Sequence, residues 1–369
     1  MKKGLKKLLV LALIVLVYGC GPEALADENK DLEAYIEATA YMLEENRDNF
    51  SQKTIDKLEN RLDDSRDLLE TRKAEENRAM DLEKRIQEEI LNNFKERNKT
   101  FRIDVNDYID EERIHEIFDE ALREDRYFYY AIYKGANIST NYYEDTNEDG
   151  VYFVESVDFT MTYRQSKEDE KKVDEFVEKW IKDNISDDMT DLEKTKLIHD
   201  FIVKRNSYNT GDGNDRSGGY SIYSPASILF GKGGVCNAYA TLFDKMSGMA
   251  GLRTYYSTGV IKGDGQLHIW NMVKIDDDWY NIDLTWDDPI LTSDKKIINE
   301  KEFVAYDFFL VSDELIQNTR TVDKDDKRPT SVNSYAHEFE NTKIKFEKKD
   351  SKNSYVCRIE NNKRSYHFF

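Results

Sequence analysis

No glycine and no proline interrupts the chain between Glu23 and Lys134, and this absence constrains the fold more than any other feature of the sequence. Glycine and proline end helices, whereas the Glu, Lys, Arg and Leu residues that dominate the first part of this stretch favour them. We therefore predict two or three amphipathic helices over residues 28–98, forming either a stalk or a hairpin against the rest of the chain.

The apolar stripe of these predicted helices is interrupted. Ile55, Leu58 and Leu62 follow heptad spacing, but the next position of the stripe is Ser65, so the sequence does not support a long dedicated coiled coil. The many charged residues most simply form the solvent-exposed face of these helices. The alternative is that this region binds a helix of a partner protein.

The first twenty residues carry a targeting pattern. Met1–Lys7 is basic, and Leu8–Val17 is an unbroken apolar run that is too short to span a bilayer but typical of a secretory signal. Val17-Tyr18-Gly19-Cys20 resembles a bacterial lipobox. That resemblance implies cleavage before Cys20, lipid attachment to its thiol, and an anchor at the extracellular face of a bacterial cell membrane. An ordinary signal peptide with an incidental cysteine is the alternative.

The composition excludes several classes of protein. A net charge of -20 over 369 residues argues against a general affinity for nucleic acid, whose phosphates attract Lys and Arg. Cleavage before Cys20 would remove four lysines and no acid, which makes the mature chain still more negative. Three cysteines are too few for a disulfide framework, and 12% aromatic residues are too many for a disordered polymer.

Aromatic and β-branched residues dominate two later segments, Tyr127–Tyr133 and Val151–Tyr163, and predict strands. Between them, Asp145–Gly150 begins like a calcium-binding loop, but Ser156 stands where such a loop requires a bidentate acid. A hairpin turn on Asp149-Gly150 explains the same residues without an ion.

The second half of the chain alternates helix and strand signals. Thr190-Asp-Leu-Glu193 matches a capping box that opens a helix. The other predicted elements are a helix over 168–185, strands over 254–261, 267–275 and 279–286, and a last hairpin formed by 355–360 and 364–369.

Cys236 lies between a glycine-rich loop, Gly231–Val235, and an apolar helix that begins with Ala238 and Tyr239. At the N-terminus of a helix, the unpaired N–H groups and the macrodipole favour an anion such as a thiolate. The same N–H groups are candidates for an oxyanion hole. A buried cysteine that acts as a small hydrophobe is the ordinary alternative.

His268 and Asp283 lie on two predicted strands joined by a tight acidic turn at Asp276-Asp277. A two-residue loop places His268 opposite Thr285 and Asp283 opposite Trp270. Asp283 is then a diagonal neighbour of His268 on the same face, within reach of an imidazole–carboxylate hydrogen bond. A three-residue loop would put them on opposite faces. In this arrangement the carboxylate orients the imidazole, which exchanges protons with the thiol and the leaving group.

Three blocks of sequence resemble the core of the transglutaminase-like superfamily: Gly234-Val-Cys-Asn-Ala-Tyr-Ala240, His268-Ile-Trp-Asn271 and Trp279-Tyr-Asn-Ile-Asp-Leu-Thr-Trp-Asp-Asp-Pro289. The resemblance covers roughly residues 186–315. It implies a papain-like α+β fold, with Cys236 as nucleophile, His268 as general base and acid, and Asp283 as the orienting carboxylate. Members of this superfamily include protein-crosslinking transglutaminases, cysteine peptidases, amidases and catalytically inactive scaffolds.

The other cysteines and histidines offer weaker sites. His199 lies beside Asp200 on a predicted helix, where a structural hydrogen bond is the favoured interpretation. We assign Cys357, in the last hairpin, to packing. Cys236, His268 and Cys357 lack the short paired spacing of zinc ligands, and the sequence contains no Walker or Rossmann phosphate loop. We therefore expect no metal and no other cofactor.

The predicted domains are a signal peptide over 1–19, a helical membrane-proximal region over 20–100, an α+β intermediate region over 101–185, a catalytic domain over 186–320 and a C-terminal extension over 321–369. We expect a cell-surface enzyme that performs thiol-dependent acyl transfer on peptide or protein amides, cell-wall peptides among them. Water as acceptor would make it a cysteine peptidase or amidase, and an amine would make it a transglutaminase. The alternative is a non-catalytic surface binding or assembly protein with the same fold.

Overall fold

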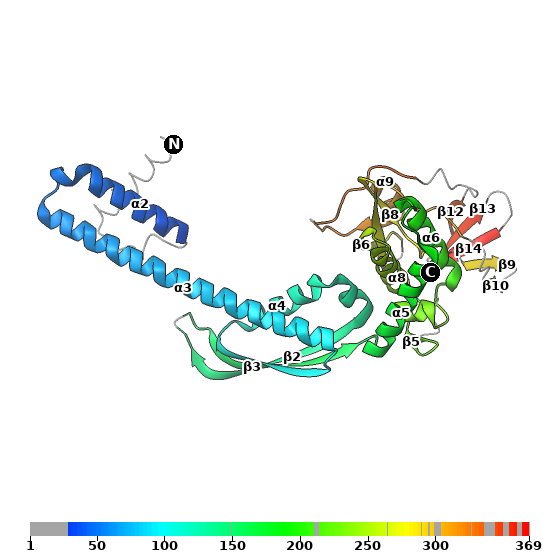
Figure 1. Cartoon of the computed structure of the whole chain (residues 1–369), viewed down its shortest axis with the longest axis horizontal. Coiled ribbons are helices and arrows are strands. Elements are labelled where there is room, and N and C mark those ends of the chain that lie inside the picture. The colour runs from blue at the N-terminus through cyan, green and yellow to red at the C-terminus, as the bar shows by residue number, and fades with distance from the viewer. Residues whose placement is uncertain are drawn as a thin grey trace. The chain divides into compact units, whose positions relative to one another are not determined.

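The computed structural model (Figure 1) describes residues 29–147, 149–209, 214–263, 265–288, 290–293, 296–298, 304–325, 327–335, 344–349, 354–359 and 364–368. The chain divides into two compact units, Met1–Glu89 and Ile90–Phe369. Cys20 and the predicted signal peptide lie outside the described residues. Within the described part of the chain, no helix combines the length and the apolar character needed to cross a bilayer.

The first unit contains a helical hairpin. α2 (Asn29–Asn46) leads through a short 3-10 turn to α3 (Gln52–Glu96), which continues into the second unit. Leu43, near the end of α2, packs against Leu58 of α3, whereas Leu32, near its start, packs with Leu69. The two helices are therefore antiparallel, and the helices predicted from the absence of glycine and proline are confirmed.

The second unit begins with a small sheet covered by a helix. β1 (Thr100–Tyr108), β3 (Tyr152–Tyr163) and β2 (Tyr133–Thr146) form an antiparallel sheet in that order. α4 (Glu111–Glu124) places Phe118 on this sheet, where its ring stacks on Phe159 with centroids 5.8 Å apart. The side chain of Asn147 accepts backbone hydrogen bonds from Asp149 and Val151, and this interaction forms the predicted hairpin turn between β2 and β3.

The strand predicted over residues 127–133 is wrong. The chain forms a π-helical turn, η3 (Phe128–Ile132), and β2 begins only at Tyr133. The buried residues of the turn are Phe128, Ala131 and Ile132, a helical spacing rather than the alternation of a strand. Asp125 fixes the turn because its carboxylate accepts the backbone N–H of Phe128 at 2.8 Å.

The remaining helices and strands of the second unit form an α+β domain, which confirms the predicted fold class. The helices are α5 (Lys167–Asn184), α6 (Asp191–Arg205), α7 (Pro225–Leu229), α8 (Cys236–Met249) and α9 (Asp313–Ile316). The main sheet has the order β11-β6-β7-β8, formed by β11 (Arg320–Val322), β6 (Arg253–Ile261), β7 (Leu267–Ile275) and β8 (Asp278–Ile282). The predicted capping box at Thr190 and Glu193 opens α6.

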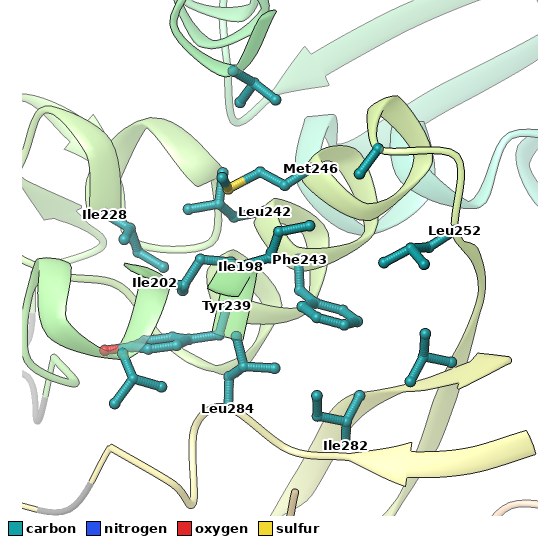
Figure 2. Close-up of a cluster of buried hydrophobic side chains, with 14 of the residues drawn as sticks. Ile198, Ile202, Ile228, Tyr239, Leu242, Phe243, Met246, Leu252, Ile282 and Leu284 are labelled. Atoms are coloured by element: carbon teal, nitrogen blue, oxygen red, sulfur yellow. The ribbon is translucent and has the colours of Figure 1, made fainter. Parts of the chain in front are cut away.

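The core of this domain lies between α8 and the main sheet. α8 packs on β6 and β7, and its buried face carries Tyr239, Leu242, Phe243 and Met246 (Figure 2). Ile282, at the end of β8, belongs to the same cluster, and so do residues of α6 and α7. The first residue of α8 is therefore held at a fixed place relative to the ends of β7 and β8.

Two further sheets complete the described chain. A two-stranded ribbon pairs β4 (Arg216–Ser217) with β5 (Tyr220–Ser221). The C-terminal sheet has the order β10-β9-β14-β13-β12, formed by β10 (Lys296–Ile298), β9 (Ile290–Ser293), β14 (Arg364–Phe368), β13 (Ser354–Ile359) and β12 (Ile344–Lys349). The predicted hairpin is confirmed by the pairing of Ile359 with Arg364, whereas β12 was not predicted. The side chain of Cys357 lies outside the described features, so its packing role stays a prediction.

Truncation of a single ring in the α8 core tests this architecture. Phe243 is fully buried, so Phe243→Ala is expected to lower the free energy of unfolding by about 3–5 kcal/mol. Urea denaturation followed by tryptophan fluorescence reports on the unfolding of the second unit, because all four tryptophans lie after residue 179. The matched control is Phe230→Ala at a residue with 36% exposure, which should cost distinctly less. Equal losses for both variants would contradict the described core.

Candidate active site

Cys236 is the first residue of α8, and the glycine loop before it is required by close backbone packing. Gly233 has a φ of 113°, and a Cβ at this position would lie 2.0 Å from the carbonyl oxygen of Ser207. Only glycine fits such a position. The thiol that this loop presents is half-buried, and its sulfur lies 3.8 Å from the side-chain oxygen of Asn237.

The hairpin of β7 and β8 brings a histidine and an aspartate together. Ile275 pairs with Asp278 across the two-residue turn, as predicted. The predicted pairs of His268 with Thr285 and of Trp270 with Asp283 are wrong, because β8 ends at Ile282 and the chain then turns. His268 Nε2 nevertheless lies 2.8 Å from Asp283 Oδ2.

The turn after β8 explains how Asp283 reaches His268 without strand pairing. Asp283 Oδ1 accepts the backbone N–H groups of Thr285 and Trp286 at 3.1 and 3.3 Å. The carboxylate therefore caps its own turn with one oxygen and holds the imidazole with the other. The contact between His268 and Asp283 depends on this turn as well as on the hairpin register.

Burial and charge act in opposite directions on the two side chains. Burial lowers the pKa of His268, but the charge and hydrogen bond of Asp283, helped by the neighbouring Cys236 sulfur, raise it to about 9. Burial raises the pKa of Asp283, but His268 and Arg320 lower it to about 2. Cys236 is close enough to His268 to contribute to this raised pKa, and both side chains line the same cleft. The structure thus brings the thiol of Cys236 near the imidazole of His268, which is hydrogen-bonded to Asp283.

Arg320 is part of this site and was not predicted from the sequence. It is fully buried on β11, and its guanidinium binds Asp283 Oδ2, the oxygen that also contacts His268. The guanidinium carbon lies 5.1 Å from the ring centre of Trp270 and 4.6 Å from that of Trp286. Sequence alone gives no signal for this role, because it depends on the pairing of β11 with the distant strand β6.

A cleft of about 480 Å³ opens beside the thiol. Cys236, Asn237 and His268 line it, together with residues from before α5. Those earlier residues are Tyr129, Tyr130, Tyr133, Lys134 and Arg164. The incorrectly predicted segment thus contributes directly to the site, since the carbonyl oxygen of Tyr130 in η3 accepts a hydrogen bond from Asn237 Nδ2 at 3.3 Å.

His199 belongs to a second buried network rather than to the cleft. Its Nδ1 lies 3.2 Å from Asp200 Oδ1 and its Nε2 lies 3.1 Å from Asp287 Oδ2, which is the structural hydrogen bonding predicted for it. Beside it, burial raises the pKa of Asp288 to about 8, and Tyr239 donates its hydroxyl to this carboxyl. The network ties α6 and α8 to the turn that follows β8. Among the described residues, no cluster of three or more His, Cys, Asp or Glu side chains could hold a metal ion.

Replacement of the buried arginine measures how far the site depends on it. Arg320→Met is expected to lower the free energy of unfolding by about 3–5 kcal/mol, because it removes one partner of a buried ion pair. Arg102→Met is the matched control, since Arg102 pairs with Asp158 on the exposed surface of the same unit. Urea denaturation of both variants checks the prediction. A loss for Arg320→Met no larger than that for Arg102→Met would refute it.

Comparisons with known proteins find similar sequences over part of the chain. The model of the Transglutaminase-like superfamily matches residues 178–284. Kyphoscoliosis peptidase from Homo sapiens is 25% identical over 152 residues, and its mouse (Mus musculus) counterpart is 24% identical; each match covers 37% of the chain. The match spans only 23% of either relative, about a quarter of its length.

Solved structures with similar segments include a candidate cysteine protease from Cytophaga hutchinsonii and a TGase, each 14% identical over 50% of the chain. They are covered over 71% and 50% of their own lengths, with TM-scores of 0.25 and 0.27. The domain that contains Cys236, His268 and Asp283 belongs to the transglutaminase-like superfamily.

Proposed function

We propose that this domain is an enzyme that performs thiol-dependent acyl transfer on peptide or protein amides. Cys236 is the nucleophile, His268 the general base and acid, and Asp283 the orienting carboxylate. One observation carries the proposal: the fold joins a half-buried thiol at a helix N-terminus to an imidazole whose pKa a buried carboxylate raises to about 9. Such a cluster facing a cleft is the usual setting of a nucleophilic cysteine.

The reaction follows from these positions. The proton of Cys236 passes to His268, and the sulfur attacks the amide carbonyl to form a tetrahedral intermediate. His268 then returns the proton to the departing amine, the C–N bond breaks, and an acyl-enzyme remains. Water or an amine, deprotonated by His268, attacks the thioester and releases the free thiol. The raised pKa of His268 lets the imidazole hold the proton taken from Cys236 until it passes to the leaving amine.

The intermediate needs hydrogen-bond donors for its oxyanion. The backbone N–H of Cys236, at the start of α8, is one donor. Tyr208 is the candidate for a second donor, because it lies close to Cys236 and burial holds the pKa of its hydroxyl well above 10. A protonated phenol can donate to an oxyanion, whereas a phenolate cannot.

The activity depends on which molecule accepts the acyl group, and the substrate depends on where the protein is located. Water as acceptor makes the enzyme a cysteine peptidase or amidase, and the name of the related kyphoscoliosis peptidase supports hydrolysis. An amine as acceptor would make it a transglutaminase. The lipobox-like sequence before Cys20 supports a lipid anchor at the extracellular face of a bacterial membrane, where cell-wall peptides are the available amides.

The nucleophile is tested by alkylation with iodoacetamide, followed by intact mass. Cys236 should react at least about tenfold faster than free cysteine at pH 7, because the proposed role of His268 is to take the proton from this thiol as the sulfur attacks. Cys236→Ala should remove the fast-reacting site, and His268→Ala should slow the reaction of Cys236. A rate no higher than that of free cysteine would indicate the other hypothesis, a surface binding or assembly protein that keeps the fold without turnover.

The pKa of His268 provides a second test. Its signal in spectra of ¹³C-histidine-labelled protein, assigned with His268→Gln, should titrate near pH 9. In Asp283→Asn the pKa should fall toward or below 6.5, since burial still lowers it and the carboxylate is gone. Because the folded pKa is raised, the stability that this charge contributes is complete below about pH 6.5 and disappears as the pH rises through 9. An unchanged titration in Asp283→Asn would contradict the assigned role of the carboxylate.

One substrate, tested with and without a primary amine, distinguishes hydrolysis from acyl transfer to an amine. A glutamine-containing peptide is incubated with the enzyme, and ammonia release and mass adducts are measured. Adduct formation with the amine establishes transfer. Ammonia release that the amine does not change, without an adduct, excludes transglutaminase activity on that peptide.

A further inference from the structure

We infer that Arg164 forms a subsite for a substrate carboxylate next to Cys236. The inference rests on the proposed acyl transfer and names a chemical class for its substrates: peptides that carry a carboxylate, from an acidic side chain or from a free C-terminus, close to the scissile amide.

Among the described residues, a backbone carbonyl and an aromatic ring, rather than a carboxylate, hold the Arg164 guanidinium in place. The backbone N–H of Arg164, directly after β3, donates to the carbonyl of Ile132 at 2.7 Å. Its Nη1 donates to the carbonyl of Tyr130 at 3.0 Å, and its guanidinium carbon lies 4.7 Å from the ring centre of Tyr223. A carbonyl and a ring face fix the position of the guanidinium but leave its charge uncompensated.

The carbonyl oxygen of Tyr130 connects Arg164 to the reactive residue. It accepts Nη1 of Arg164 at 3.0 Å and Nδ2 of Asn237 at 3.3 Å, so both nitrogens contact one atom. Asn237 follows Cys236 directly on α8. Arg164 and Cys236 also line the same cleft. A substrate whose carbonyl carbon is at the sulfur therefore has its neighbouring groups within reach of the guanidinium.

The charges around the cleft favour an incoming anion at this point. Among the ion pairs of the described residues, Lys134 pairs with Asp215 at 2.9 Å, whereas Arg164 pairs with no carboxylate. Asp323 also lines the cleft but is exposed and forms no ion pair with Arg164 within the described part of the chain. Burial lowers the pKa of Arg164, yet the group stays charged because the ordinary value is 12.5.

A half-buried, uncompensated arginine is well suited to recognise a carboxylate. Its planar fork can donate two parallel hydrogen bonds to the two carboxylate oxygens, and partial burial weakens the screening by water. Tyr129 and Tyr133, which stack with ring centres 6.1 Å apart, provide an aromatic wall for the aliphatic part of such a substrate. The family match begins at residue 178, so this recognition comes from the segment before it.

The test measures how well short peptides protect Cys236 from iodoacetamide. Four competitors form two matched pairs: Ac-Ala-Glu-Ala-Ala-NH₂ with Ac-Ala-Gln-Ala-Ala-NH₂, and Ac-Ala-Ala-Ala-Ala-OH with Ac-Ala-Ala-Ala-Ala-NH₂. At least one carboxylate peptide should protect at a concentration about tenfold lower than its neutral twin, the effect expected for hydrogen bonds to a charged group. Preference in the first pair identifies an acidic side chain, and preference in the second a terminal carboxylate.

Variants assign the preference to Arg164. Arg164→Gln keeps a donor for the carbonyl of Tyr130 but removes the charge, and it should reduce the preference to about onefold. Lys134→Gln removes a charge of the same cleft that Asp215 already pairs, and it should change the preference by less than about twofold. Equal protection by both members of each pair, no protection by any peptide, or a preference that persists in Arg164→Gln would overturn the inference.

The same experiment separates this inference from the proposed function. The alkylation rate of Cys236 without a competitor reports the activated thiol, and the ratio between matched peptides reports the subsite. Fast alkylation of Cys236 with no preference between matched peptides supports the proposed nucleophile and rejects the subsite. A slow rate with a preference that Arg164→Gln abolishes rejects the enzyme and retains a carboxylate-binding cleft.

Discussion

The carboxylate of Asp283 is the interaction on which the rest of the site depends. It is fully buried, and its two oxygens hold His268, Arg320 and the backbone of the turn after β8. An isolated buried carboxylate would be protonated rather than charged, because burial strongly disfavours the ion. Arg320 offsets that cost, and the ionised carboxylate can then raise the pKa of His268 despite the burial of the imidazole.

Because Arg320 and His268 contact the same carboxylate oxygen, Arg320 also limits how far Asp283 raises the pKa of His268. Both groups contact Oδ2, so the positive guanidinium reduces the attraction that the carboxylate exerts on the imidazolium. The faces of Trp270, Trp286 and Phe308 around Arg320 exclude water and stabilise its charge by cation–π contact. The arrangement keeps the carboxylate ionised and still allows His268 to release its proton.

The sequence predicted the parts of the site that are local along the chain. The glycine loop before Cys236 and the two-residue turn at Asp276-Asp277 each depend on a few neighbouring residues, and the structure has both. Two parts could not be read in this way. The segment of η3 is aromatic enough to resemble a strand, and only packing and the Asp125 cap select the helical turn. Arg320 becomes a partner of Asp283 only through the pairing of β11 with β6, a contact between segments about sixty residues apart.

The residues of the site come from two kinds of segment along the chain. The segment that matches the superfamily, residues 178–284, contains the thiol of Cys236, the imidazole of His268 and the carboxylate of Asp283. The residues that adjust this core lie outside it: Arg164 and Tyr130 come before, and Arg320 comes after. Changes in the flanking segments can therefore alter the shape and charge of the cleft while Cys236, His268 and Asp283 stay in place. Under the proposed function, the residues around η3 and the end of β3, rather than α8 itself, would decide which amides reach the thiol.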